Sequence, residues 1–317
     1  MNEKLHILIT IFITILSLIV TPLIYNQPFM EHNVFVPEKE EKFKTLIEKD
    51  NIILNKNKNT IRVMTFNLLV HYPSWGGKPV HERADDFFEL RDGYLPDVLG
   101  VQEMCGDWYS EICDNKSPFK FAAPLKTAFP QKMTALIYNS DTVEIIDSGS
   151  FAFSDTLNFR ARRIVWGVFK FKMTNDIFTV VNTHLNFLET TEEEDNFFRQ
   201  SRQVNELYNA TKELYSDYPY PIIILGDFNA KKRDVYHNSV IRSGSYGILN
   251  SVYTDAQDLA ENKFFGENAY LGNSLNDHIF IKGELYVKNI ALLSQNAFSE
   301  LSDHYPLLAD ITFENKP

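Results

Sequence analysis

The chain has 317 residues, of which 44% are hydrophobic and 14% are aromatic, so it can bury a sizeable core and is not a disordered or low-complexity protein. Lys and Arg number 31 against 42 Asp and Glu, which gives a formal net charge of −11. This charge weighs against a protein that holds nucleic acid by a broad basic surface, but it allows an enzyme that contacts a few phosphates through a metal ion.

An uncharged apolar segment lies near the N-terminus, between Ile7 and Tyr25. At about 1.5 Å of rise per residue, a helix of this length nearly spans a hydrocarbon core of ~30 Å. We expect residues 1–26 to be a signal anchor, because the segment is long and no small-residue cleavage site follows it; a cleaved signal peptide is the alternative. Lys4 precedes the segment, and acidic residues follow it. The positive-inside rule then predicts an extracytoplasmic catalytic domain, membrane-anchored or secreted.

Residues 27–58 are interpreted as a charged stalk or linker, and residues 59–317 as one catalytic domain. Short apolar runs rich in β-branched residues predict strands, at 61–66, 97–101, 135–138, 143–148, 164–173, 177–182, 222–225, 278–281 and 307–313. Helices are expected at 81–95 and 191–215, the second with Thr191 and Glu194 at capping-box spacing. This alternation indicates a mixed α/β domain.

Acids, amides and histidines recur where the predicted strands end. They are Asn67, Glu103, His184, Asn186, Asp227, Asn229, Asp277, Asp303 and His304. Taken singly, each has an ordinary explanation as a turn residue, a helix cap or an Asx-turn. Independent turns are a poor explanation for so many strand ends, so we expect these side chains to converge at one rim of a sheet.

Such a set suits the hydrolysis of a phosphate ester. Carboxylate and amide oxygens are ligands for a hard cation, Mg²⁺ or Mn²⁺, and the two cysteines, Cys105 and Cys113, cannot form a cysteine-based zinc site. The metal would neutralise phosphoryl oxygens, while the histidines donate hydrogen bonds to developing charge and a proton to the leaving group. Whether the two cysteines form a local disulfide is left open.

Six motifs occur in a characteristic order: TFN ending at Asn67, QE at Glu103, NTHLN around His184, GDFNA around Asp227, LNDHIFI at Asp277 and SDHYPL at His304. Together they resemble the endonuclease/exonuclease/phosphatase superfamily, whose fold is that of deoxyribonuclease I. The resemblance implies a four-layer sandwich of two mixed β-sheets flanked by helices. The exonuclease III branch has Tyr at the position of His184. The histidine is instead similar to the deoxyribonuclease I, sphingomyelinase and deadenylase branches.

The resemblance also implies roles for individual residues. Glu103, with Asn67 and Asp303, would hold the metal. Asn186 and Arg162 are candidate substrate-binding residues, although a solvated loop is the favoured interpretation of Arg162.

The implied catalytic residues are Asp227, Asn229, His304, Asp277 and His184. Asp227 would orient or deprotonate the attacking water, and Asn229 would position the phosphate. His304 would contact the phosphate, oriented by Asp277, while His184 would be a second phosphate contact or a proton donor. The identity of the general base is left open.

We therefore expect a metal-dependent phosphodiesterase with a monomeric catalytic domain and nucleic acid as the leading substrate. A sphingomyelinase-like or other lipid phosphodiesterase is the alternative, which the membrane segment mildly favours, and a non-catalytic binding module is a third possibility. His278 follows Asp277, and we expect it to pack or hydrogen-bond within the sheet and not to act in catalysis.

Overall fold

The computed structural model describes residues 56–70, 78–115, 117–123, 134–154, 162–186, 193–232, 234–236, 239–241, 244–265, 275–293 and 300–313. The expected signal anchor and nearly all of the expected stalk lie outside these residues. Among the helices that are described, none is long and apolar enough to cross a membrane.

The first sheet is mixed and has seven strands within the described residues. Their order is β12 (Asn262–Phe264), β14 (Tyr286–Leu292), β15 (Leu307–Thr312), β1 (Ile61–Asn67), β2 (Val98–Gln102), β4 (Thr134–Asn139) and β3 (Phe119–Phe121). The pairs β1–β2 and β12–β14 are parallel, and the other neighbours are antiparallel.

The second sheet is also mixed, with six strands in the part of the chain that is described. Their order is β11 (Thr254–Asp255), β13 (Asp277–Lys282), β8 (Ile222–Asp227), β7 (Ile177–His184), β6 (Arg163–Phe171) and β5 (Val143–Ala152). Strands β7 and β8 are parallel. A separate hairpin pairs β9 (Asp234–Tyr236) with β10 (Ser239–Ile241).

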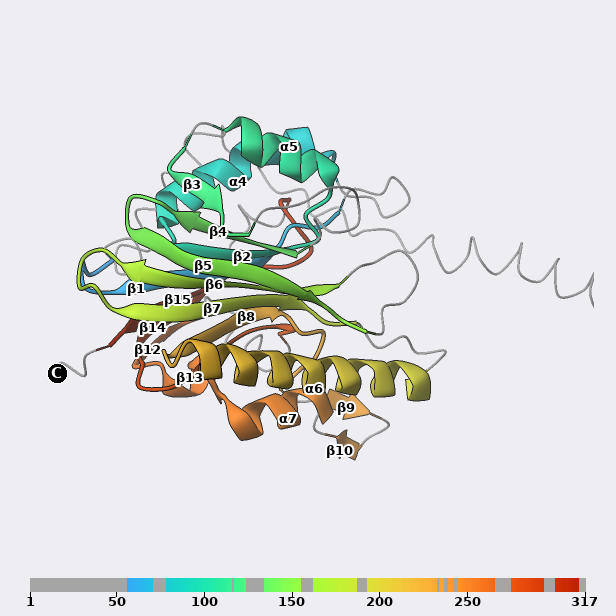
Figure 1. Ribbon diagram of the computed structural model, residues 1–317. Coiled ribbons are helices and arrows are strands. Elements are labelled where there is room, and N and C mark those ends of the chain that lie inside the picture. Colours follow the sequence, from blue (N-terminus) through green and yellow to red (C-terminus); the bar gives the residue numbers. More distant parts are fainter. Residues whose placement is uncertain are drawn as a thin grey trace, which may run out of the picture. The chain divides into compact units, whose positions relative to one another are not determined.

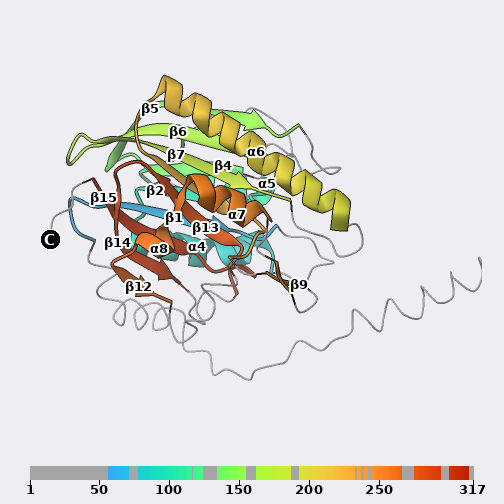
Figure 2. The same ribbon diagram turned by 90° about the horizontal axis from the view of Figure 1, so that it is seen from below.

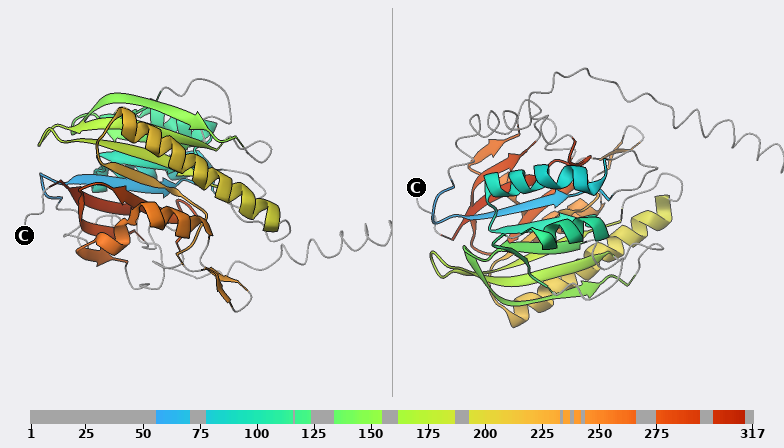
Figure 3. Two further views of the ribbon diagram at one scale, coloured as in Figure 1. Left: turned by 60° about the horizontal axis from the view of Figure 1, so that its bottom comes forward. Right: turned by 90° about the horizontal axis from the view of Figure 1, so that it is seen from above.

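Helices cover the outer faces of the two sheets, which gives the expected α/β arrangement of mixed sheets flanked by helices (Figure 1). The first sheet is covered by α4 (Val80–Tyr94) and α5 (Gly106–Asp114), which share an apolar cluster with β1 and β2. The second is covered by α6 (Glu193–Asp217) and α7 (Gly244–Val252), seen side by side in Figure 2. The short helix α8 (Ala256–Leu259) follows β11. Figure 3 shows the layers from both sides.

Alternation along the strands separates the layers. In β1, Ile61 and Val63 face the core between the sheets, whereas Met64 and Phe66 pack beneath the helices. Because side chains in a strand alternate between its two faces, Asn67 at the end of β1 continues the inner face. The same alternation places polar side chains on the inner faces at the ends of other strands, and these side chains form the site.

A buried polar contact joins the two sheets. The Asn182 Nδ2 atom on β7 donates to the carbonyls of Val101 (3.0 Å) and Ala135 (2.7 Å) in the opposite sheet. The Asn182 Oδ1 atom accepts from Gln102 Nε2 at 2.7 Å, and this same nitrogen lies 3.0 Å from Thr65 Oγ1. All of these groups are buried, and their hydrogen bonds fix the two sheets against each other directly behind the strand ends.

The main expected elements are present, with helix bounds shifted by one or two residues: Val80–Tyr94 for 81–95 and Glu193–Asp217 for 191–215. Strand β14 is not among the expected strands, because its period-two pattern is broken by a bulge between Val287 and Asn289. Helix α5 is not among the expected helices, because its nine residues are too few to show clear periodicity. Cys105 and Cys113 are free, which answers the open question about a disulfide.

Candidate active site

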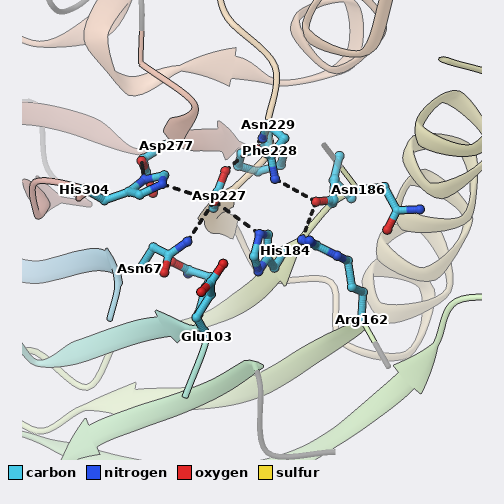
Figure 4. Close-up of polar contacts among 12 residues, drawn as sticks. Asn67, Glu103, Arg162, His184, Asn186, Asp227, Phe228, Asn229, Asp277 and His304 are labelled. Atoms are coloured by element: carbon cyan, nitrogen blue, oxygen red, sulfur yellow. Dashed lines mark hydrogen bonds and ion pairs between the residues drawn. The ribbon is translucent and has the colours of Figure 1, made fainter. Parts of the chain in front are cut away.

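The candidate site lies where strands of both sheets end at the same edge. In the second sheet, His184 at the end of β7 is the register partner of Asp227 at the end of β8. Asp277, the first residue of β13, pairs with the same Asp227 from the other side. Asn67 ends β1 in the first sheet and faces inward toward them. Figure 4 shows these side chains pointing at one another.

Asp227 is the centre of the contacts. Its Oδ2 atom accepts a hydrogen bond from Asn67 Nδ2 at 3.0 Å and lies 3.2 Å from His184 Nε2 and 3.8 Å from His304 Nε2. Its Oδ1 atom accepts from the backbone amide of Asn229 at 2.9 Å. The carboxylate is also buried, and each of its two oxygens accepts a hydrogen bond from the protein.

The charges of Asp227 and His184 follow from these contacts. Burial by itself would raise the pKa of Asp227, but His184, the nearby His304 cation and the Asn229 amide outweigh burial and hold the pKa well below its usual range. Burial and the charge of Arg162 lower the pKa of His184, although Asp227 opposes them. At neutral pH the site therefore contains an ionised Asp227 and a neutral His184.

His304 is the cation of the site. Its Nδ1 atom lies 2.6 Å from Asp277 Oδ2. Burial works against the charged ring, but Asp277, followed by Asp227 and Asp303, raises the pKa of His304 to about 11. Both ring nitrogens consequently carry protons at neutral pH, with Nδ1 donating to Asp277 and Nε2 directed at Asp227.

A divalent cation fits the donor set. Asp227, Asp277 and His304 each offer an atom within 4.8 Å of the others, but a protonated His304 has no free nitrogen for a metal. The carboxylates are better donors, and Asp277 Oδ1 is buried without a hydrogen-bond partner among the described residues. With Glu103 and Asp303 nearby, the acids outnumber the cationic groups, which suits Mg²⁺ or Mn²⁺.

The three expected metal ligands differ in their placement. Asn67 is within the group, and Glu103 is half-buried beside it, between Asn67 and His184 in Figure 4. The Oε2 atom of Glu103 accepts from the Val70 amide at 3.1 Å. Asp303 is exposed next to His304 and does not join the Asp227 contacts.

The expected substrate-binding residues also differ. Arg162 is buried and donates from Nη1 to the Leu185 carbonyl, so the favoured interpretation of a solvated loop is wrong. Asn229 Nδ2 donates to the same carbonyl at 2.9 Å. Its backbone contact with Asp227 makes the Asx-turn, so the turn and the site coincide. Asn186 is buried, and within the described structure its side chain does not reach Asp227.

His278 faces away from the site, as expected from its position one residue after Asp277. Its Nε2 atom lies 2.8 Å from the Ala230 carbonyl, and its Nδ1 atom lies 3.5 Å from Asp255 Oδ2. The ring is buried against Tyr246 on the helix side of the sheet. It supports the outer layer and takes no part in the Asp227 contacts.

Several residues that hold the site were missed in the sequence. Gln200 on α6 donates from Nε2 to the carbonyls of Asn186 (2.7 Å), Asn229 (3.0 Å) and Phe228 (3.2 Å). A single glutamine within a helix carries no sequence signal for such a role. Ser302 has a weak signal, since it precedes Asp303 and His304, and its Oγ atom donates to the Asn67 carbonyl at 2.6 Å.

Gly226 is the first residue of the GDFNA motif, and close packing of the neighbouring strand explains why it is glycine. A Cβ atom at this position would lie 2.3 Å from the Thr183 carbonyl oxygen on the neighbouring strand. Glycine therefore allows β7 and β8 to approach closely at the point where His184 and Asp227 must meet.

Comparison with known proteins gives a match to the model of the Endonuclease/Exonuclease/phosphatase family over residues 64–304. No curated protein matches the chain significantly in sequence.

Solved structures share the fold at low identity. A mannosyl-6-phosphatase from Bacteroides thetaiotaomicron is 20% identical, with a TM-score of 0.63, over 80% of this chain and 100% of that chain. The catalytic domain of human Nocturnin, with a bound sulfate anion, is 20% identical, with a TM-score of 0.60, over 81% and 94%. TDP2 from D. rerio, complexed with a single-strand DNA product, is 14% identical, with a TM-score of 0.57, over 80% and 99%.

Proposed function

The chain belongs to the endonuclease/exonuclease/phosphatase family and is a hydrolase of phosphate esters, and from this premise we propose that it is a divalent-metal-dependent phosphodiesterase acting on nucleic acid. The observation that carries the proposal is the position of Asp227, a buried carboxylate between a neutral His184 and a cationic His304. A carboxylate between one neutral and one protonated imidazole suits a reaction in which a proton is transferred and negative charge develops on the phosphoryl group.

Asp227 orients the attacking water in this proposal. Because its pKa is lowered, the carboxylate holds a proton weakly, which favours an orienting role over full proton removal. His304 presents its Nε2–H to a phosphoryl oxygen, and Asp277 keeps the ring charged and in place. The single N–H of neutral His184 donates to the phosphate or the leaving oxygen when the substrate replaces its contact with Asp227. The side chain of Asn229 helps to place the phosphate.

The metal would be held by Glu103 and Asn67, with Asp303 at the rim. A bound Mg²⁺ or Mn²⁺ supplies positive charge for the phosphoryl oxygens. Two features support a bound cation at this site: the excess of carboxylates, and the buried oxygen of Asp277 that has no partner among the described residues. Arg162, buried beside His184, adds fixed positive charge behind the substrate.

Nucleic acid is the proposed substrate, and a lipid headgroup is the second candidate. TDP2, whose fold this chain shares, was solved with a single-strand DNA product, and this supports nucleic acid as the substrate. The apolar segment between Ile7 and Tyr25 favours the lipid candidate and an extracytoplasmic or secreted location.

The test is plasmid nicking by the full-length chain with Mg²⁺, with Mn²⁺ and with excess chelator, beside the His184→Ala variant. Metal-dependent nicking that is absent from the variant supports the proposal. Full activity in chelator contradicts metal dependence. Absence of nicking together with release of phosphocholine from sphingomyelin vesicles would move the assignment to lipid, and hydrolysis of phosphate monoesters alone would make the protein a phosphatase.

A further inference from the structure

Arg83, in the first turn of α4, is a buried cation held by carbonyl groups. It is 2% exposed, and its guanidinium donates four hydrogen bonds to backbone oxygens. The acceptors are Lys78 (2.9 Å), Leu68 (2.7 Å), Leu69 (2.8 Å) and Leu301 (2.6 Å). The ring of Trp108 lies 5.0 Å from the guanidinium carbon. One side chain thus contacts three segments, of which the one at Leu301 is 218 residues away in the sequence.

Two of these segments carry the site. Leu68 and Leu69 directly follow Asn67, and Leu301 directly precedes Ser302. The Leu69 amide donates to Asn67 Oδ1 at 3.0 Å, which fixes the amide oxygen proposed to face the metal. The Ser302 Oγ atom donates to the Asn67 carbonyl and accepts the His304 amide at 3.1 Å.

The segment after β1 is strained at Leu69, and Arg83 donates a hydrogen bond to this residue. Leu69 has a φ of 53°, a left-handed conformation that is strained for a residue with a β-carbon. Its carbonyl is held both by Arg83 Nη2 and by Trp108 Nε1 at 3.3 Å. The next amide, that of Val70, binds Glu103 Oε2 at 3.1 Å. The left-handed turn therefore directs amides toward both Asn67 and Glu103.

We propose that Arg83 is a positioning residue that sets the Asn67–Glu103 half of the site and the His304 segment in one common geometry; this rests on the proposed metal-dependent function. The rigid fork of the guanidinium points donors in several fixed directions, which a lysine ammonium cannot reproduce. Arg83 does not touch the substrate or the metal and acts through the backbone of its acceptors.

Arg62 supplies a matched comparison. It is also buried, and it binds Asp310 through Nε (2.7 Å) and Nη2 (2.9 Å) and the Tyr94 carbonyl through Nη1 (2.8 Å). It lies at the other end of β1 from Asn67.

The experiment compares Arg83→Lys with Arg62→Lys in the full-length chain. Binding of Mn²⁺ alone is measured without substrate, from the loss of the free Mn²⁺ signal in electron paramagnetic resonance, beside turnover and urea unfolding. Groups that orient metal ligands typically change metal affinity by about 10- to 100-fold. We therefore expect Arg83→Lys to weaken Mn²⁺ binding by at least about tenfold, while Arg62→Lys loses stability but keeps the wild-type affinity.

Trp108→Phe keeps the test valid if Arg83→Lys does not fold. It removes the Nε1 hydrogen bond to Leu69 together with one ring of a buried side chain, and the loss of one such bond predicts about 2- to 10-fold weaker Mn²⁺ binding. Wild-type Mn²⁺ affinity in both folded variants, or an equal loss in Arg62→Lys, overturns the inference about Arg83. A wild-type chain that binds no Mn²⁺ overturns the proposed function itself, a different result that is visible without any variant.

Discussion

Replacing Asp227 by Asn is the most direct perturbation of the site, because it removes one charge and keeps the shape of the side chain. In the wild-type chain, Oδ2 of Asp227 accepts a hydrogen bond from Asn67 and lies 3.2 Å and 3.8 Å from the Nε2 atoms of His184 and His304, while Oδ1 accepts from the Asn229 amide. An amide has one oxygen, so either rotamer of the new Asn places an NH₂ group against one of these donors.

Two magnitudes follow from this geometry. The unsatisfied donor pair costs about 1–3 kcal/mol, which is small against the ordinary 5–15 kcal/mol of a folded domain, so the fold persists. The lost attraction between Asp227 and the His304 Nε2 atom, 3.8 Å away, is about 4 kcal/mol at an effective dielectric constant of about 20. The pKa of His304, raised to about 11 in the wild type, should therefore fall by as much as about 3, since one pKa unit is ~1.4 kcal/mol.

The assay has two parts. Turnover at saturating metal should fall by about 10²- to 10⁴-fold, the range for losing a group that directs proton transfer. The pKa of His304 is read from its imidazole resonances across a pH titration by NMR. Turnover within tenfold of the wild type would refute the role of Asp227, and an unchanged His304 pKa would refute the electrostatic coupling.

Three further predictions concern the same edge of the sheets. His184→Ala should abolish turnover and leave a cooperative thermal transition; loss of that transition would show that the ring is structural. The pKa of His304 is raised from 6.5 to about 11, so its contribution to stability is complete below pH 6.5 and is lost as the pH rises through about 11. Urea unfolding should therefore show stability falling over that window by up to about 1.4 kcal/mol per pH unit, and more weakly in His304→Gln; identical slopes would count against the raised pKa. Gly226→Ala should destabilise the protein by more than about 1 kcal/mol because its Cβ would meet the Thr183 carbonyl at 2.3 Å. Gly247→Ala in α7, with nothing within 4 Å of the added carbon, should be neutral or stabilising by up to about 1 kcal/mol in the same denaturation assay.

The sequence predicts most of the fold because the buried strands are apolar and clearly bounded. The polar residues at strand ends were informative for a physical reason: the alternation that sends Val63 and Ile223 into the core also sends Asn67 and Asp227 to its rim. The meeting of strands from two sheets turns these separate motifs into one site. Their chemical roles remain predictions.

Residues that act through backbone carbonyls could not be found in the same way. Arg83 and Gln200 occupy ordinary helical positions, and their acceptors lie in loops and strand ends outside their own helices. Left-handed residues such as Leu69 and Glu103 were also hidden, because neither residue type is typical of that conformation. Contacts of this kind depend on the conformation of loops relative to the sheets. The local periodicity of the sequence carries no information about that conformation.

The Asn182 contact between the sheets affects how the protein unfolds and loses activity. The donors and acceptors of this contact come from both sheets, as do the members of the site in front of it. A partly unfolded form that keeps one sheet intact would retain half of the Asp227 partners and expose unpaired amides and carbonyls. Such a form is inactive and costly, so loss of activity and global unfolding should occur together on heating. Hydrogen exchange at Val101 and Asn182 should then report the same opening free energy as inactivation.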